Sequence, residues 1–420
     1  MIRARRLGRA TFSSLSNRNY RLYFIGQIIS VSGTWMQRLA QAWLILSLTH
    51  FNGFALGVES ALQFLPMLLF GAWGGVIADR FDKRRILLLT QVLAGVLALG
   101  LGLIVALGAA TVFLDYLFSV LLGFVNVIDN PARQTFVMEM VGRDELPNAV
   151  GLNSVVMNSS RVVGPAIGGI VIEAVGLGPC FFFNAASYLA VLLALWLMNG
   201  DLLQKVATIP RAKGQLREGF RYVWSDRMVR TTLVMMAVIG TLAFNFQVVI
   251  PLISTKTFGL GAGGFGGLTS AMGAGAVLGG LAAASRRGVS YRRLLGLTYA
   301  MGVSILLAAI APTLATEVVA LFVMGAASFA FIATANTTLQ LTSRPEMRGR
   351  VMALYAIAFL GSTPVGSPIV GWICAVFGPR AGFAVGGVAA LVAGFVAWLS
   401  FARLRSERES RVGAVAAHAA

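Results

Sequence analysis

Charged residues and metal-binding side chains are scarce in this sequence. Only 12% of the 420 residues are charged, and the chain has two cysteines and two histidines. Two cysteines, Cys180 and Cys374, cannot build a disulfide framework or a cysteine-rich metal site. The glycine-rich run at 259–267 lacks the Lys-Ser/Thr pair of a phosphate-binding loop. Since no catalytic triad is apparent either, we expect no cofactor, no metal, no ATP hydrolysis and no enzymatic activity.

Apolar residues, in contrast, make up 57% of the chain, and the mean hydropathy is +0.79. A water-soluble domain of this size could not bury so much apolar surface, so a soluble fold is excluded. The apolar runs are continuous over about 20 residues, whereas the strands of an outer-membrane barrel alternate over roughly 10 residues. The sequence therefore predicts an all-α membrane protein.

The apolar runs predict twelve transmembrane helices, each long enough to cross about 30 Å of hydrocarbon. The predicted helices cover residues 22–48, 53–78, 86–108, 111–134, 148–175, 179–198, 229–255, 262–284, 292–312, 316–339, 350–376 and 380–402. An even number of helices places both termini on the same side of the membrane.

Basic residues are distributed unequally between the two sides of this topology. With both termini in the cytoplasm, all but four of the 34 Lys and Arg residues fall on the cytoplasmic side. The exceptions are Arg38, Arg161, Lys256 and Arg380. The positive-inside rule therefore predicts an N-in, C-in orientation. The net charge of +18 reflects this topology, so no nucleic acid partner is expected.

One long polar interval divides the predicted helices six and six. Faint internal similarity supports two duplicated halves, because Asn130–Gln134 resembles Asn336–Gln340 further along the chain. Duplicated bundles place a binding site at their interface near the membrane midplane. The predicted division is a cytoplasmic N-terminal arm at 1–20, a first six-helix bundle at 21–198, a cytoplasmic linker at 199–227, a second six-helix bundle at 228–402 and a cytoplasmic tail at 403–420.

A short loop after the second predicted helix carries one acid followed by a basic cluster. The segment Gly75-Val-Ile-Ala-Asp79-Arg80-Phe-Asp82-Lys83-Arg84-Arg85 resembles the first-loop signature of the major facilitator superfamily. The resemblance implies that Asp79 faces a helix N-terminus of the other bundle in one transport state, an attraction of about 0.3–2 kcal/mol. The alternative is that the loop only anchors the topology. The expected switch residues are Gly75, Asp79, Arg80, Arg84 and Arg133.

Two departures from the signature affect this switch. Asp82 stands where the family usually has a second glycine, and Ala284 stands opposite Asp79 in the second half. The switch is therefore expected to act from one side only.

The fifth predicted helix carries small residues at intervals of four. Ser160, Gly164 and Gly168 share one face, which lets a neighbouring helix approach, and Pro165 bends the axis. The helix resembles the glycine-proline signature of the superfamily's drug:proton antiporters, represented here by Gly151, Ser160, Gly164, Pro165, Gly168 and Gly169. The whole chain is thus similar to the branch that includes enterobactin-type siderophore exporters and multidrug efflux pumps. Generic packing of small residues is the alternative.

Polar side chains recur at spacings of three and four along the first, fourth and fifth predicted helices. Such stripes line a cavity or form hydrogen bonds between helices, and both interpretations stay open. The residues expected on a substrate or proton pathway are Gln37, Arg38, Gln41, Glu59, Asn126, Asp129, Asn158 and Arg161.

Ionisable side chains within a membrane are costly, so their positions indicate function. Glu59 and Asp129 fall within the first bundle, with Asp115 near an outer helix end, whereas Glu173 and Glu317 fall near outer edges. The second bundle is expected to hold no acid at depth, which assigns any proton carrier to the first bundle. Asp129 either pairs locally with a neighbouring arginine or takes part in gating.

The two arginines near mid-depth, Arg38 and Arg161, have two interpretations as well. They attract an anionic substrate group, or they pair with a structural partner.

The patterns and the resemblance together predict a secondary active transporter that exports small amphipathic molecules, drugs or secondary metabolites, by proton antiport with alternating access. The expected partners are a small-molecule substrate, protons and the lipid bilayer, and the expected state is a multi-pass monomer in the cell membrane. One alternative is a dedicated siderophore or metabolite exporter. A non-transporting membrane scaffold or assembly factor is the alternative from another class.

Overall fold

The computed structural model describes residues 12–204, 215–284, 288, 290–359 and 361–419, and within these ranges it is helical without strands. The first eleven residues of the expected N-terminal arm and the middle of the expected linker lie outside the described residues. An all-α membrane fold is confirmed, because ten described helices are long and apolar enough to cross a membrane.

The ten candidate spans relate simply to the twelve predicted ones. The 64-residue α5 (Val112–Val175) turns at Gly142, where φ is 76°, and so covers two predicted helices. The 31-residue α2 (Arg18–Leu48) covers the first predicted helix but is not among the ten, since its polar stripe lowers its hydropathy. The count of twelve and the N-in, C-in orientation stay predictions.

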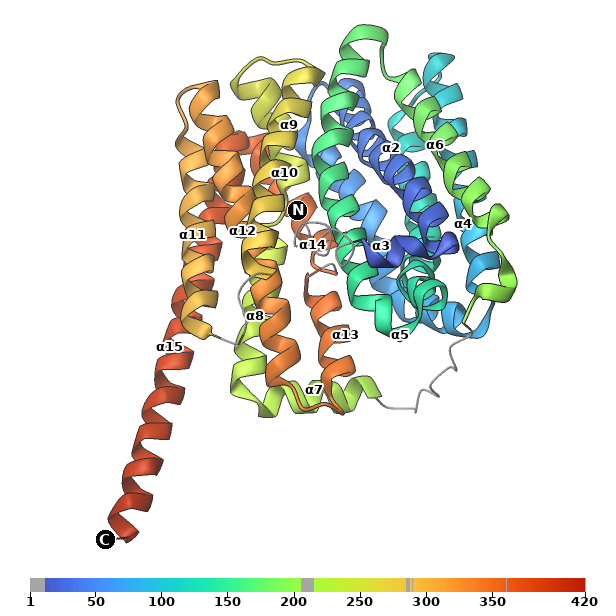
Figure 1. Ribbon diagram of the computed structural model, residues 1–420. Helices are drawn as coiled ribbons and strands as arrows, with labels where there is room; N and C mark the ends of the chain where they lie inside the picture. The colour runs from blue at the N-terminus through green and yellow to red at the C-terminus, as the bar shows by residue number, and fades with distance from the viewer. Residues whose placement is uncertain (1–11, 205–214, 285–287, 289, 360, 420) are drawn as a thin grey trace, which may run out of the picture.

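Successive long helices run in opposite directions and are joined by short turns (Figure 1). Polar side chains begin several of them, as when Asn52 accepts hydrogen bonds from the backbone of Phe54 and Ala55. The other elements are η1 (Ser13–Ser16), α3 (Gly53–Arg80), α4 (Lys83–Ala106), α6 (Gly178–Leu197), η2 (Gly200–Leu202), α7 (Gln215–Ser225), α8 (Arg227–Leu242), α9 (Phe246–Leu252), η3 (Ile253–Thr257), α10 (Ala262–Ala284), α11 (Tyr291–Ile310), α12 (Leu314–Thr342), α13 (Arg348–Phe359), α14 (Thr363–Phe377) and α15 (Pro379–Ala419).

Helix starts repeat between the two halves of the chain. Thr111 caps α5 and Thr313 caps α12, both with φ −128° and ψ 158°. Each threonine is followed four residues later by a buried acid, Asp115 or Glu317. This repeated cap is a structural counterpart of the faint internal similarity in the sequence.

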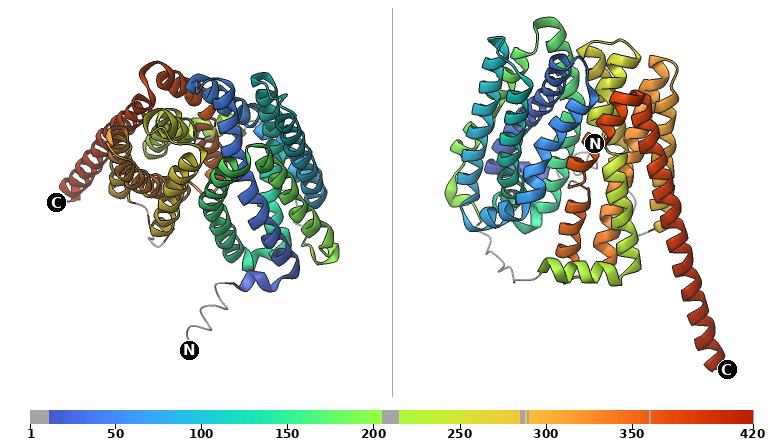
Figure 2. Two further views of the ribbon diagram at one scale, coloured as in Figure 1. Left: turned by 90° about the horizontal axis from the view of Figure 1, so that it is seen from above. Right: turned by 180° about the vertical axis from the view of Figure 1, so that it is seen from behind.

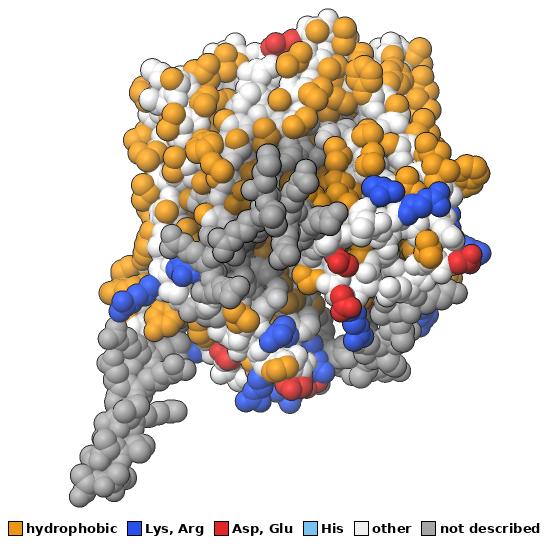
Figure 3. All heavy atoms as spheres, viewed as in Figure 1, with side chains coloured by type: hydrophobic (Ala, Val, Ile, Leu, Met, Phe, Trp, Pro, Cys, Tyr) orange, Lys and Arg blue, Asp and Glu red, His pale blue; other side chains and the backbone are white. Residues whose placement is uncertain are grey.

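The molecule has a linker side, where α7 lies, and a far side at the opposite ends of the long helices (Figure 1). In the face shown in Figure 3, apolar side chains cover the upper part, and most Lys, Arg, Asp and Glu side chains lie toward the linker side. A broad apolar band next to a charged end is the surface expected of a protein embedded in a bilayer.

Helices α2 to α6 form one group and α8 to α15 form another (Figure 2). Near the linker side each group has its own apolar core, one around Phe136 and Met140 and another around Val229 and Val351. A larger core joins residues of both groups, including Leu56 and Phe246. The two groups therefore share a core in one region and keep separate cores near the linker side.

Close backbone approaches join the two groups toward the far side. A Cβ at Gly57 of α3 would meet the backbone of Ser367 in α14, and one at Gly266 of α10 would meet the carbonyl oxygen of Pro165 in α5. Only glycine permits such distances. The protein is therefore closed on the far side through two pairs of helices, α3 with α14 and α5 with α10.

Within the second group, α10 packs on α12 just as closely, which leads to a stability prediction. A Cβ at Gly275 would meet the backbone of Phe322, whereas a Cβ at Gly280 of the same helix would meet nothing within 4 Å. Gly275→Ala should therefore destabilise the protein by about 1–3 kcal/mol through overpacking. Gly280→Ala should be neutral or stabilising by up to about 1 kcal/mol, because alanine favours helix. Thermal unfolding in detergent measures both, and equal melting temperatures would contradict the packing.

Candidate functional site

Arg38 of α2 and Arg161 of α5 lie on the same aromatic ring. The guanidinium carbon of Arg38 is 4.9 Å from the ring centre of Trp35, and that of Arg161 is 5.0 Å from it. Arg161 also lies 4.7 Å from the ring centre of Phe329, which belongs to α12 in the other group. Aromatic faces stabilise cations without neutralising them. The two arginines thus form a positive cluster that reaches across the boundary between the groups.

The Nε atoms of both arginines are buried and have no hydrogen-bond partner among the described residues. Their guanidinium groups lie over the aromatic rings, and the charge of Glu59 also acts on Arg38. A buried cation whose donors are incompletely used is suited to bind an anionic or hydrogen-bond-accepting group.

A second cluster contains two buried acids. Ser119 donates a hydrogen bond to Glu59 (3.1 Å) and accepts one from the amide of Gln41 (2.8 Å). Asp115 lies one helical turn before Ser119 on α5, and neither of its carboxylate oxygens has a hydrogen-bond partner among the described residues. Glu59 is 6% exposed and Asp115 is 1% exposed. Two acids in such surroundings are candidates for carrying protons.

Asp129 lies in a different environment, because both of its oxygens are fully used. One oxygen accepts from Thr90 (2.7 Å) and Gln91 (2.9 Å) of α4, and the other accepts two hydrogen bonds from Arg133 (2.8 and 2.6 Å). Arg133 in turn donates to Gln27 of α2. The network ties three helices of the first group together, which corresponds to the local pairing that the sequence left open.

Amides of the α2 stripe are also used between helices. Gln37 accepts a hydrogen bond from Asn184 of α6 (2.5 Å), and Gln27 and Gln41 are bonded as described above. These three amides are buried. Asn158 is half-buried and donates to a carbonyl of its own helix (2.8 Å), and Asn126 is half-buried as well. The three amides of α2 therefore form hydrogen bonds between helices. Arg38 on the same helix lies instead over the ring of Trp35.

The small-residue motif of α5 has two contact faces. The hydroxyl oxygens of Ser160 and Ser32 of α2 are 3.1 Å apart, within hydrogen-bond distance. Cβ atoms at Gly164 and Gly168 would meet Trp35 and Met36 of the same helix. The other face meets α10, since a Cβ at Gly169 would lie 2.7 Å from the carbonyl oxygen of Ala262. Pro165 joins this second face through Gly266, while Gly151 has open space around it. The motif packs α5 against its own group and against the other group at once.

Charged residues at the loop between α3 and α4, on the linker side, contact helix ends within the first group. Asp82 caps α4 by accepting from the backbone of Arg85 (2.9 Å), which explains an acid at this turn. Arg84 donates to the carbonyl oxygens of Leu195 and Trp196 at the end of α6 (2.8 and 3.1 Å). Arg80 is exposed.

Helix packing next to this loop involves Gly74, which precedes the expected Gly75. A Cβ at Gly74 of α3 would meet the carbonyl oxygen of Val127 in α5. The role of Gly75 in the switch stays a prediction.

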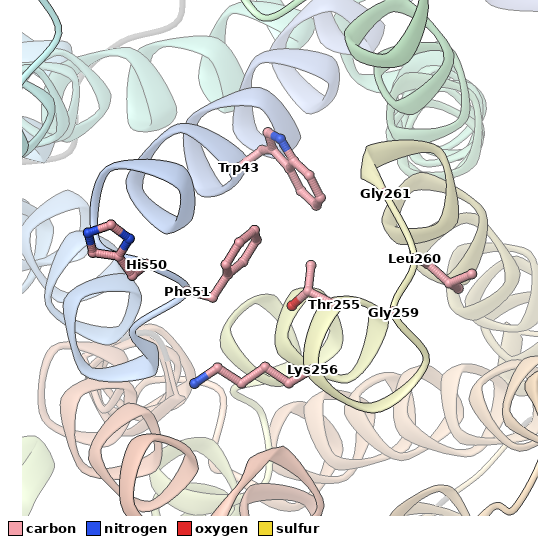
Figure 4. Close-up of a pocket in the computed structure, with 8 residues that line it drawn as sticks. All are labelled: Trp43, His50, Phe51, Thr255, Lys256, Gly259, Leu260 and Gly261. Carbon is pink, nitrogen blue, oxygen red and sulfur yellow. The ribbon is translucent and has the colours of Figure 1, made fainter.

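A cavity of about 410 Å³ lies on the far side between the two groups. Trp43 and Phe51 of the first group face Thr255 of the second group across it (Figure 4). His50, Lys256, Leu260 and the glycines at 259 and 261 complete its lining.

Several important residues were not singled out from the sequence. Trp35 could have been found, because it lies three residues before Arg38 on the same helix face. Phe329 gave no signal, since an apolar side chain on an apolar stretch of a membrane helix does not by itself indicate a site. Glu317 was assigned to an outer edge, and it lies in the first turn of α12 with its side chain 1% exposed, a burial that the sequence did not indicate. The expectation that the second bundle holds no acid at depth stays a prediction. In the described part of the chain, no group of three metal-ligating side chains is found.

The comparisons with known proteins agree with the fold and the membrane setting. Residues 9–416 match a family model described as a transmembrane secretion effector. The enterobactin exporter of Shigella flexneri is 24% identical over 396 residues, 93% of both chains. The staphyloferrin A transporter of Staphylococcus aureus is 25% identical over 244 residues, which are 56% of this chain and 59% of that one.

Solved transporter structures have the same fold. A bacterial homologue of the human lysosomal transporter Spinster, inward-facing and unoccupied, aligns with a TM-score of 0.73 at 16% identity, covering 91% of this chain and 97% of that one. The nucleoside transporter NupG aligns with a TM-score of 0.73 at 11% identity, covering 91% of this chain and 99% of that one. These proteins are membrane transporters and not enzymes. The chain belongs to the major facilitator superfamily of transporters, in its transmembrane secretion effector family.

Proposed function

We propose that this transporter exports small amphipathic molecules carrying an acidic or polyphenolic group, in exchange for protons. The observation that carries the proposal is the pair of arginines on Trp35, with Arg161 extending to Phe329. Cations and flat rings together suit a ligand that has both an anionic or accepting group and an apolar body. Because the cluster takes residues from both groups of helices, relative movement of the groups changes the site.

Glu59 and Asp115 are our choice for the proton sites. Asp129 suits this role less well, because a proton there would weaken four hydrogen bonds that join α4 to α5 and position Arg133, which in turn bonds Gln27 of α2. Glu59 also lies close enough to Arg38 for their charges to interact. Proton uptake at Glu59 would therefore change the charge around Arg38, which is a direct way to couple protons to an anionic substrate.

A dedicated siderophore exporter is the second candidate. Two of the named relatives are an enterobactin exporter and a staphyloferrin A transporter. The enterobactin exporter is matched over 93% of its length, which favours this candidate over a broad drug pump. The named relatives are transporters, so they lend no support to a membrane scaffold.

The linker-side loop completes the proposed cycle. In this account Asp79 attracts a helix N-terminus of the second group when the linker side closes, and it releases that helix when the far side closes. The transporter would operate as a monomer in the cell membrane, with the linker side in the cytoplasm as the positive-inside rule requires.

The arginine site leads to a substrate prediction. Arg38→Gln and Arg161→Gln should each raise KM for an anionic dye such as carboxyfluorescein by roughly tenfold to a hundredfold, because a charge-assisted hydrogen bond contributes about 1.5–3 kcal/mol. Efflux from proteoliposomes measures this effect. Arg230→Gln is the matched control, since Arg230 also lies on a tryptophan ring, 5.9 Å from the centre of Trp224, but away from the site.

Cationic dyes provide the opposing test of the same site. Strong efflux of ethidium that neither arginine substitution changes would contradict an anion site and leave both arginines with structural roles.

Coupling is tested by changing Glu59 and Asp115 together and Asp129 on its own. Glu59→Gln and Asp115→Asn, combined in one variant, should abolish the acceleration of efflux by an imposed pH gradient and leave substrate exchange without a gradient measurable. Asp129→Asn should instead lower the melting temperature, because the buried network loses charge-assisted hydrogen bonds. Full gradient dependence in the double variant would exclude Glu59 and Asp115 as the proton sites.

A further inference from the structure

Glu173 lies at the far-side end of α5 and contacts the first turn of α10. Its Oε1 accepts a hydrogen bond from the backbone N–H of Gly263 at 3.0 Å. Gly263 is the second residue of α10, which has 23 residues. The first N–H groups of such a helix have no partner within it, and they carry a partial positive charge. A carboxylate from the first group of helices therefore satisfies a helix start in the second group.

The residues at the start of α10 cannot cap the helix themselves, so the cap has to come from another segment of the chain. The residue before the helix is Gly261, which has no side chain to cap it. A Cβ at Gly261 would lie 2.7 Å from Oε1 of Glu173, and a Cβ at Gly263 would lie 2.5 Å from Oε2. Any side chain at either position would displace the carboxylate. The glycine-rich run that resembles a phosphate loop thus makes room for Glu173.

The contact lies in the part of the interface that has to separate when the far side opens. On the adjacent turn, a Cβ at Gly169 would meet Ala262, and further along the same two helices Ser270 donates a hydrogen bond to the carbonyl oxygen of Val162 at 2.7 Å. Far-side opening moves α5 away from α10 and so removes the hydrogen bond between Glu173 and Gly263. Since Glu173 is exposed, water solvates its carboxylate once the helices part. The contact therefore stabilises the closed far side by a small free energy, and the helices can still separate.

We propose that Glu173 is a gating residue that stabilises the far-side closure of this transporter by capping α10 from across the interface. It acts on the side of the protein opposite to Asp79, in the other half of the transport cycle. The proposal depends neither on proton coupling nor on the identity of the substrate. It depends only on the two helix groups separating on the far side.

Accessibility of a cysteine at Ala262 tests the proposal. Ala262 is 2% exposed in the closed interface, so a thiol there reacts with a water-soluble maleimide mainly when α5 and α10 part. Ala262→Cys is introduced after Cys180 and Cys374 are replaced by alanine, and the purified full-length protein is labelled in nanodiscs. Both membrane faces are then accessible to the reagent.

Glu173→Gln should accelerate labelling by about two- to fivefold, the range expected for a carboxylate at an exposed helix N-terminus. Gly263→Ala should accelerate it as well, because the added methyl group displaces the carboxylate while Glu173 keeps its charge. Glu346→Gln is the matched control, since Glu346 is an exposed acid on the linker side, and it should label at the parent rate.

Melting temperatures establish that each variant is folded. An unchanged labelling rate in both folded variants would overturn the gating role, as would equal acceleration in Glu346→Gln. Glu173→Gln retains the size of the side chain, so the test survives if Gly263→Ala fails to fold.

Discussion

The close approach of α5 to α10 is the contact on which the far-side closure depends. At Gly169 and Gly266 the two backbones meet with no side chain between them, and Pro165 contributes a carbonyl oxygen to the same surface. Without a hydrophobic driving force between helices in lipid, small residues allow the packing that holds helices together. The α3 and α14 pair closes the opposite flank through Gly53 and Gly371. Closed contacts made by backbone atoms have little freedom to adapt, so the interface favours discrete closed and open arrangements over intermediate ones.

Helix α5 connects the far-side closure with the arginine cluster. Arg161 precedes Pro165 by one turn, and a Cβ at Gly273 of α10 would meet the carbonyl oxygen of Arg161. Movement of α5 relative to α10 therefore moves the Arg161 side chain relative to Phe329. Glu59 and Asp115, in contrast, lie among α2, α3 and α5, inside one group. Rigid movement of the groups leaves the acids together with Arg38, and it changes the contact between Arg161 and Phe329 of the other group.

The sequence was sufficient for the all-α membrane fold and the superfamily, because both depend on apolar runs and on short motifs. Spacing also predicted the face formed by Ser160, Gly164 and Gly168. It could not predict which partner each face meets, so the contact of Gly169 with α10 emerged only from the structure. Asp129 and Glu59 looked alike as buried acids, and only their neighbours distinguish a saturated carboxylate from a sparsely bonded one. The roles of Phe329 and Glu173 depend on contacts between distant segments, which no local pattern encodes.

Distances between the two helix groups test the central claim, alternating access around this interface, most directly. Spin labels at Val175 and Phe377 report on the far side, and labels at Phe81 and Tyr291 report on the linker side, since all four side chains are exposed. Pulsed electron paramagnetic resonance in proteoliposomes, with and without a pH gradient and an exported dye, gives both distance distributions. Alternating access predicts that the far-side distance lengthens in the same population in which the linker-side distance shortens. Distances that stay fixed under all conditions, or that lengthen on both sides together, would contradict it.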